Sequence, residues 1–180
     1  VDESYVERMQ NLVDGLAPGA RLLLFAFDRF HDTTGRADPA LTSFYTPNAY
    51  ARQIAARHPQ YFAWAASIHP YRADCVEQLA AAVEGGALAV KWLPPAMGID
   101  PSSAQCDRFY TALAAHGLPL ISHAGEEKAV RGSDRQAFGN PLLLRRALDH
   151  GVRVVVAHCA SLGEAVDLDR GANGPQLPCF

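Results

Sequence analysis

Short apolar segments recur along the chain, and each one ends at a polar or ionisable residue. These final residues are Asp28, His69, Lys91, His123 and His158. The segments are rich in β-favouring residues, as expected for parallel strands that are buried on both faces. In parallel α/β folds the carboxyl ends of the strands open on one side, and catalytic groups collect there. The pattern therefore predicts that histidines, a lysine and further polar groups converge at one mouth.

Segments with helical start and stop signals separate these strands. The expected helices cover residues 4–16, 48–58, 74–84, 102–116 and 142–150. Thr46 is expected to cap the second of them, with Pro47 at its first position, and Asn140 and Pro141 open the last. Glycine just beyond a helix favours the left-handed conformation that ends it, and Gly117 is one example.

Strands that alternate with helices predict an α/β fold with a parallel sheet. A closed (β/α)₈ barrel typically needs about 250 residues, and this chain has 180. Either an open doubly wound domain or a partial barrel fits. The partial barrel is favoured because a helix precedes the first strand, residues 167–180 read as a loop-like tail, and no glycine-rich phosphate loop follows the first strand. We expect one partial barrel domain over residues 1–180, with long loops at 29–45 and 126–139 shaping a substrate site.

The composition indicates a globular protein and excludes several classes. Hydrophobic residues make up 49% of the chain, and the formal net charge is −3. Without a basic stripe we expect no nucleic-acid partner, and without an apolar stretch of about 20 residues we expect no membrane span. The four cysteines lack CxxC spacing, which favours reduced thiols in a cytoplasmic protein. Cys159 is expected to be a buried strand-end thiol rather than a nucleophile.

His123 and His158 are the strongest candidates for a site. Neutral imidazole at the end of a rigid strand is a common ligand for zinc and similar metals. A single histidine in such a place is more often a structural residue bonded to a neighbouring loop. Two of them at equivalent positions of successive strands favour a metal site.

Lys91 ends an otherwise apolar strand, where a lysine is costly unless it is paired or functional. It could be an amine nucleophile, a partner for a substrate carboxylate, a carbamylated lysine that bridges two metals, or half of a salt bridge. His69 is followed by proline and either lines the substrate pocket or caps a loop.

Other polar residues near the strand ends are weaker candidates for the site. Asp28 either orients a histidine or caps a loop. Glu126, Glu127 and Lys128 are expected to form a solvated face, with Glu126 close enough to His123 to bind substrate. Trp92 is expected to belong to a partly apolar wall of the substrate pocket.

Four segments in succession resemble a metal-dependent hydrolase of the amidohydrolase superfamily, in the branch that also holds related decarboxylases. They are SIHP, VKWLPP, LPLISHAGEE and NPLLLRRALDHGVRVVVAHCAS, and the resemblance covers almost the whole chain. It implies a TIM barrel of the (β/α)₈ type, of which this chain holds about strands two to six. In that family the histidines of strands five and six bind the catalytic metal, and they match His123 and His158. Some subgroups carry a carbamylated lysine after strand four, which matches Lys91.

The sequence departs from the family in two places. The family's HxH pair of strand one is absent, because no HxH occurs in the sequence, and the aspartate of strand eight has no counterpart. The chain therefore supplies two ligands of a site that needs about four. We expect it to be a piece of a longer polypeptide or a shortened sequence.

The resemblance implies a hydrolase that cleaves a C–N or C–O bond of an amide, ester or lactone-like small molecule through metal-activated water. The implied catalytic residues are Lys91, His123 and His158, and zinc is the expected ion, with manganese or another divalent ion as alternatives. A decarboxylase on the same scaffold is the first alternative. A metal-free structural module is the second, and an aldolase built on Lys91 is the third. The open edges of a partial barrel favour a homo-oligomer.

Overall fold

The computed structural model describes residues 2–130 and 133–180 and shows strands that alternate with helices. The helices are α1 (Asp2–Asp14), α2 (Asn48–Arg57), α3 (Cys75–Glu84), α4 (Pro94–Met97), α5 (Asp107–His116) and α6 (Arg145–Asp149). The strands are β1 (Leu22–Phe25), β2 (Phe62–Ala65), β3 (Val90–Trp92), β4 (Leu120–Ser122), β5 (Val154–Val156), β6 (Glu164–Val166) and β7 (Gln176–Pro178). Short 3₁₀ segments are η1 (Ala104–Cys106), η2 (Ser133–Gly139), η3 (Pro141–Leu144), η4 (Ala157–Ala160) and η5 (Leu168–Arg170).

The first five strands follow one another in a parallel arc. β1 pairs with β2, and β4 pairs with both β3 and β5. A single parallel bridge between Ala66 and Val90 joins the two sets, and Lys91 N–H donates to the Ala66 carbonyl at 2.7 Å. Strand order therefore equals chain order, which is the arrangement of consecutive strands in a (β/α)₈ barrel.

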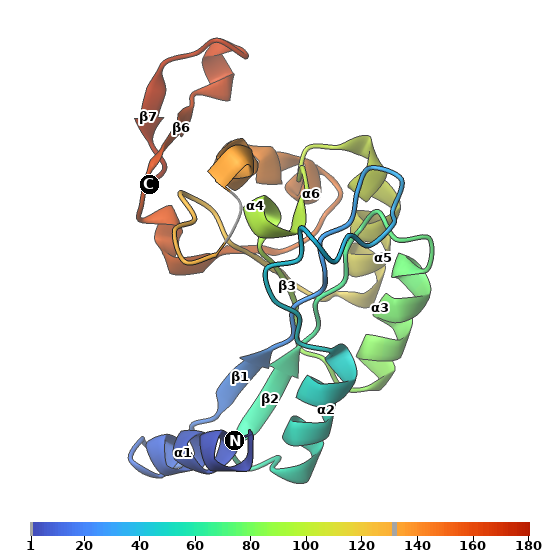
Figure 1. Ribbon diagram of the computed structural model, residues 1–180, viewed down its shortest axis with the longest axis vertical. Coiled ribbons are helices and arrows are strands. Elements are labelled where there is room, and N and C mark those ends of the chain that lie inside the picture. Colours follow the sequence, from blue (N-terminus) through green and yellow to red (C-terminus); the bar gives the residue numbers. More distant parts are fainter. Residues whose placement is uncertain (1, 131–132) are drawn as a thin grey trace.

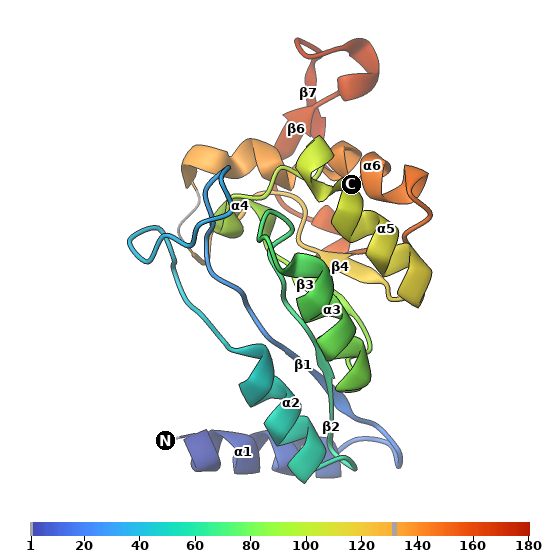
Figure 2. The same ribbon diagram turned by 90° about the vertical axis from the view of Figure 1, so that its right-hand side faces the viewer.

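The helices cover one side of this arc. Figures 1 and 2 show α2, α3 and α5 along the same side of the strands, while α1 crosses the end of β1 and β2. The core lies between the strands and these helices. Trp92 of β3 is fully buried there against Phe109 of α5, with ring centroids 5.6 Å apart. Trp64 of β2 is also buried and donates to the Gly85 carbonyl at the end of α3.

Most of the expected helix boundaries are confirmed. The Ser103 hydroxyl accepts from Gln105 N–H at the start of η1, and α5 ends at Gly117 with φ +64°. Asn140 caps η3, which continues into α6. The expected cap at Thr46 is wrong, because Thr46 instead pairs with Phe27 in an antiparallel bridge and Pro47 precedes the helix.

The C-terminal segment is not the loop-like tail that the sequence suggested. β6 and β7 form an antiparallel hairpin, with Val166 opposite Gln176, and Figure 1 shows it extending away from the rest of the molecule. Its strands, EAV and QLP, contain no continuous apolar run of the kind that marks β3 to β5, so no strand could be recognised there.

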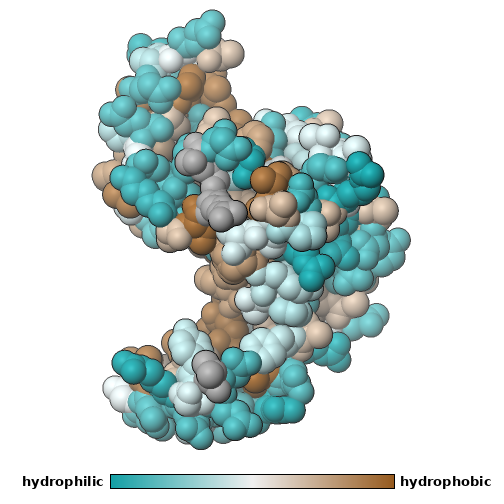
Figure 3. Space-filling model, viewed as in Figure 1, coloured by the Kyte–Doolittle hydropathy of each residue, from teal (hydrophilic) through white to brown (hydrophobic). Residues whose placement is uncertain are grey.

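Apolar side chains remain exposed along the inner side and at the two outer strands of the arc. Phe25 of β1 is 37% exposed, and Val155 and Val156 of β5 are 49% and 38% exposed. Figure 3 shows apolar surface at the waist of the molecule, where β1 and β2 meet the larger half. Among the described residues, no helix has both the length and the apolar character needed to cross a membrane.

Candidate functional site

The two strand-end histidines lie side by side. His123 directly follows β4, and His158 lies in η4, directly after β5. Because β4 and β5 are paired in register, with Ser122 opposite Val156, the residues that follow them reach the same mouth. His158 Nε2 is 2.9 Å from His123 Nδ1, and the ring centroids are 4.7 Å apart. The sequence thus predicted correctly that His123 and His158 lie close together. Their role as metal ligands stays a prediction.

Hydrogen bonding indicates which nitrogen of His123 carries a proton. Nε2 lies 3.2 Å from the Gly125 carbonyl oxygen, which can only accept, so Nε2 is the donor. Nδ1 of the neutral ring is then a lone pair that faces His158. Burial lowers the pKa of His123, and the nearby His158 and Lys91 add to this effect, while Glu127 opposes it. The ring is therefore held in the neutral form that binds metals.

Glu127 also belongs to this cluster, and the expectation that it lies on a solvated face was wrong. Its side chain is 8% exposed, and its Oε2 lies 3.5 Å from His123 Nδ1. Its Oε1 accepts from the backbone N–H groups of Ala129 and Val130 at 2.6 and 3.2 Å. Gln136 holds its backbone on both sides, with Gln136 Oε1 2.8 Å from Glu127 N and Gln136 Nε2 2.8 Å from Glu127 O.

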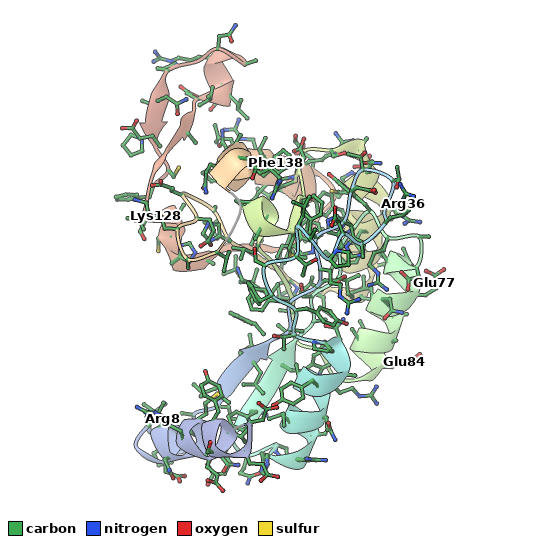
Figure 4. All side chains as sticks on the ribbon, in the orientation of Figure 1. Arg8, Arg36, Glu77, Glu84, Lys128 and Phe138 are labelled. Carbon is green, nitrogen blue, oxygen red and sulfur yellow. The ribbon has the colours of Figure 1, made fainter. Side chains whose placement is uncertain are left out.

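The turn at Gly125 decides which of the two adjacent glutamates points inward. Gly125 has φ +88°, and a Cβ there would lie 2.6 Å from the Leu162 carbonyl oxygen. Its N–H donates to the Gly139 carbonyl, and Glu126 N–H donates to the Leu162 carbonyl at 2.9 Å. Glu126 is left 41% exposed in an ion pair with Lys128. In Figure 4, Lys128 lies at the outer rim of the loop. A glycine two residues after a strand-end histidine was the available signal for such a turn.

Lys91 lies on the inner side of the arc. It is 6% exposed, and its Nζ donates to the Trp92 carbonyl at 2.9 Å and lies 5.9 Å from the centre of the Phe25 ring. Burial lowers the pKa of this amine to about 8, and the Glu127 carboxylate works against that shift. Lys91 falls in the middle of β3 rather than after it, since Trp92 is also paired with β4.

Trp92 does not line the mouth as expected. Successive residues of a strand point to opposite faces, so Lys91 on the inner face puts Trp92 on the outer one. There it is fully buried, and its indole N–H donates to the Ile68 carbonyl at 2.8 Å. The expectation that Trp92 lines the substrate pocket was therefore wrong.

His69 is fully buried, with both ring nitrogens used inside the protein. Its Nε2 donates to the Met97 carbonyl at 2.9 Å, and its Nδ1 accepts from Tyr71 N–H at 3.2 Å. Burial, with a contribution from neighbouring His31, lowers its pKa to about 3. A neutral ring with both nitrogens engaged fits the loop-capping alternative better than a substrate contact.

Asp28 holds the start of the same loop. Its Oδ2 accepts from the backbone N–H of His69 at 2.9 Å, and its Oδ1 accepts from Arg29 N–H at 2.8 Å. Arg72 approaches it to 3.4 Å. Of the two roles weighed for Asp28, the structure shows the loop cap.

The backbone at His158 is strained. His158, Cys159 and Ala160 have φ of +42°, +57° and +50°, a region that residues other than glycine seldom adopt. Each such residue costs on the order of 1–3 kcal/mol and persists only where its surroundings impose it, most often at functional sites. Cys159 is exposed in this turn, and the expectation of a buried thiol was wrong.

A groove of about 730 Å³ adjoins the loop that carries Glu127. It lies between η2 and the β6–β7 hairpin, and Gly125 and Glu126 form one of its walls. Phe138 and Leu143 contribute apolar surface, and Figure 4 places Phe138 on η2 beside this opening. Lys91, His123 and His158 are not among the residues that line it, so the groove adjoins the histidine pair without containing it.

The donor atoms suit a divalent ion in chemistry, although they are not yet arranged as a complete site. Zinc–nitrogen bonds of about 2.0–2.1 Å put two nitrogens of a tetrahedral ion about 3.3 Å apart, close to the observed 2.9 Å. Across residues 2–130 and 133–180, no three side chains of the ligand types His, Cys, Asp and Glu already form a metal-binding group. The two histidines therefore fit as a pair of ligands.

Residues 19–176 match the sequence profile of the family described as amidohydrolase. The chain belongs to the amidohydrolase family. A solved structure of an uncharacterised TIM-barrel protein from Bordetella bronchiseptica is 21% identical to this amidohydrolase chain, with a TM-score of 0.54 over 71% of this chain and 45% of that one. An amidohydrolase II structure is 18% identical, with a TM-score of 0.47 over 63% of this chain and 43% of that one. No curated protein matches.

The predicted fold class is confirmed. This amidohydrolase chain is an α/β chain that matches a TIM barrel, and it spans 45% of the length of the Bordetella protein, so it corresponds to part of a barrel. The five consecutive parallel strands of the arc are the matching architecture.

Proposed function

We propose that this amidohydrolase chain carries the two-histidine part of a metal-dependent hydrolase site that acts on a C–N or C–O bond of a small amide, ester or lactone-like molecule. Family membership supports this proposal, because amidohydrolases are typically metal-dependent. The observation that carries it is the 2.9 Å approach of His158 Nε2 to His123 Nδ1 at the ends of two paired parallel strands.

His123 and His158 would hold the ion, and zinc is the ion that we propose, since imidazole nitrogen is among its usual ligands. A bound zinc ion supplies Lewis acidity, which lowers the pKa of water toward about 7 and polarises a carbonyl group. The Gly125 carbonyl fixes the tautomer of His123, and the paired strands fix the position of both rings. Rings whose positions are fixed need little reordering when an ion binds, which reduces the entropy lost on binding.

Lys91 places a buried amine on the inner face next to this pair. In its ammonium form it can bind a substrate carboxylate, and in its neutral form it can react with carbon dioxide to give the carbamate that would bridge a second ion. A buried cation that recognises a carboxylate favours the second candidate function, decarboxylation on the same scaffold.

Elemental analysis of the purified chain tests the proposal. We expect near-stoichiometric zinc or manganese in the intact chain and its loss in the His123→Ala/His158→Ala double variant. A His58→Ala/His116→Ala variant, which removes two histidines at helix ends, is the matched control and should keep the metal. An intact chain without metal after incubation with zinc would refute the proposal and leave the metal-free structural module.

A further inference from the structure

A buried hydroxyl at the end of β2 has no partner in the protein. Ser67 is 2% exposed, and among the described residues its Oγ is the one buried side-chain oxygen or nitrogen without a hydrogen bond. Such groups are rare, because an unpaired buried hydroxyl is destabilising. An alanine, the residue at three of the four preceding positions, would fill this place without that penalty. The hydroxyl is therefore a candidate for contact with a ligand.

The backbone of Ser67 is held on both sides by one side chain. Pairing of β2 with β1 ends at Ala65, because Phe27 turns away to pair with Thr46. Asn48, at the start of α2, takes the place of a neighbouring strand. Its Nδ2 donates to the Ser67 carbonyl at 3.0 Å, and its Oδ1 accepts from Ser67 N–H at 2.8 Å. With both backbone groups bonded, the hydroxyl alone is left for a ligand.

Lys91 is the neighbour of Ser67 on the adjacent strand. Ala66 and Val90 form a parallel bridge, so the residues that follow them, Ser67 and Lys91, lie opposite each other. Ala66 and Val90 belong to the core beneath the helices, and side chains alternate along a strand, so Ser67 and Lys91 share the inner face. Neighbouring strands lie about 4.7–4.9 Å apart, which brings the hydroxyl and the amine within reach of one small group.

The amine of Lys91 has no anionic partner of its own. It carries three N–H donors, and the Trp92 carbonyl accepts one of them at 2.9 Å. The charge of Glu127 favours the ammonium form, but the Glu127 oxygens accept from backbone N–H groups of their own loop and face His123. A buried cation and a buried hydroxyl, side by side, can both donate to a negatively charged acceptor.

We propose that Ser67 and Lys91 form a subsite for the carboxylate of an apolar or aromatic substrate, with the hydroxyl donating to one oxygen and the ammonium to the other. This assignment rests on the proposed function, and it adds a contact that neither the strand-end pattern nor the family resemblance marked. The Phe25 ring, 37% exposed and 5.9 Å from Lys91 Nζ, suits an apolar body beside the carboxylate. Because Ser67 Oγ is closed to solvent, we expect the Lys91 side chain to leave the Trp92 carbonyl as the ligand enters.

Titration of the metal-free 180-residue chain with sodium benzoate, followed by amide chemical shifts in NMR, tests the subsite. We expect Ser67→Ala to weaken benzoate binding about tenfold or more, as for the loss of a hydrogen bond to a charged group. Benzamide, the neutral counterpart of benzoate, should bind more weakly than benzoate to the parent chain. Ser122→Ala is the matched control, because Ser122 is also fully buried but its hydroxyl already donates to the His123 carbonyl at 3.0 Å. Its benzoate affinity should stay within about twofold of the parent value.

Urea denaturation of the same variants separates a ligand contact from a structural role. Ser67→Ala removes an unpaired hydroxyl and should leave the urea midpoint unchanged or raise it, whereas Ser122→Ala removes a hydrogen bond in use and should lower it. A lower midpoint or a failure to fold in Ser67→Ala would overturn the assignment, because the hydroxyl would then serve the protein itself.

The outcomes also distinguish the subsite from the metal site. A parent chain that shows no benzoate-induced shift, or an equal benzoate affinity in Ser67→Ala, refutes the subsite, while zinc bound by His123 and His158 would still uphold the proposed function. Benzoate binding that is weakened in Ser67→Ala, in a chain that takes up no zinc, would support the subsite and refute the metal-dependent hydrolase.

Discussion

The buried imidazole of His69 makes the stability of the chain depend on pH. The folded protein keeps this ring neutral down to a pKa of about 3, because burial opposes the charged form, whereas the unfolded chain takes up the proton near 6.5. The unfolded state therefore binds more protons between these values, and the free energy of unfolding falls as the pH drops from 6.5 toward 3. The slope from this one residue is about 1.4 kcal/mol per pH unit.

Urea denaturation at pH 7, 5 and 4 measures this slope. In His69→Gln the contribution should vanish, because an amide does not titrate in this range while it can still donate to the Met97 carbonyl. Equal slopes in the parent and the variant would show that another group carries the acid sensitivity.

Single residues also show which parts of the candidate site could be predicted from the sequence. The strand-end pattern was enough to pair His123 with His158, since neighbouring parallel strands bring their ends together. The same pattern could not choose between Glu126 and Glu127, because the choice depends on the backbone at Gly125 and on its close contact with Leu162. That contact joins segments far apart in the chain, so nothing local encodes it.

At the scale of an element, the sequence already contained the alternation of side chains between the two faces of β3, but Trp92 was expected on the wrong face. Lys91 and Trp92 are adjacent, and a strand must send them to opposite sides. Because Lys91 was expected at the mouth, Trp92 had to lie on the opposite face, which the helices cover. There it stacks on Phe109. The β6–β7 hairpin was missed for another reason. Its strands, EAV and QLP, contain no continuous apolar run of the kind that marks β3 to β5.

Asn140 joins two elements through one side chain. Its Oδ1 accepts from Leu142 N–H at 3.0 Å and caps η3, while its Nδ2 donates to the Val166 carbonyl at 2.9 Å and anchors the hairpin. Asn140→Asp keeps the cap and removes the donor, whereas Asn140→Ala removes both. We expect faster amide exchange in residues 164–178 of both variants, and a loss of about 0.5–2 kcal/mol from the missing cap only in Asn140→Ala.

Hydrogen exchange with mass spectrometry measures the amide exchange rate of the hairpin, and urea denaturation measures the free energy of unfolding that the cap contributes. The two variants should agree in the first measurement and differ in the second. A hairpin that exchanges at the parent rate in Asn140→Asp would mean that further contacts to this segment, such as the ion pair of Arg145 with Asp169, are sufficient to hold it.

At the scale of the whole molecule, the arc of strands ends in two edges that the described residues leave uncovered. β1 pairs only with β2, and β5 only with β4, within the sheets of the described residues. Phe25 at one edge and Val156 at the other are more than a third exposed. Parallel sheets are normally covered on both faces and closed or protected at their edges, and an exposed apolar edge is a template for another strand.

We therefore expect the chain to self-associate through these edges, as the sequence analysis proposed. Light scattering after size exclusion at micromolar concentration should give a mass above the 19.4 kDa of one chain. Val156→Lys places a charge on the β5 edge and should shift the mass toward that of one chain, since lysine is a common means of blocking edge pairing. Leu12→Lys, at a 61% exposed position on helix α1 rather than on a strand, is the control and should leave the mass unchanged. A parent chain that elutes as a monomer would refute the expectation, and an equal effect of both lysines would assign the association to general hydrophobic surface rather than to the strand edge.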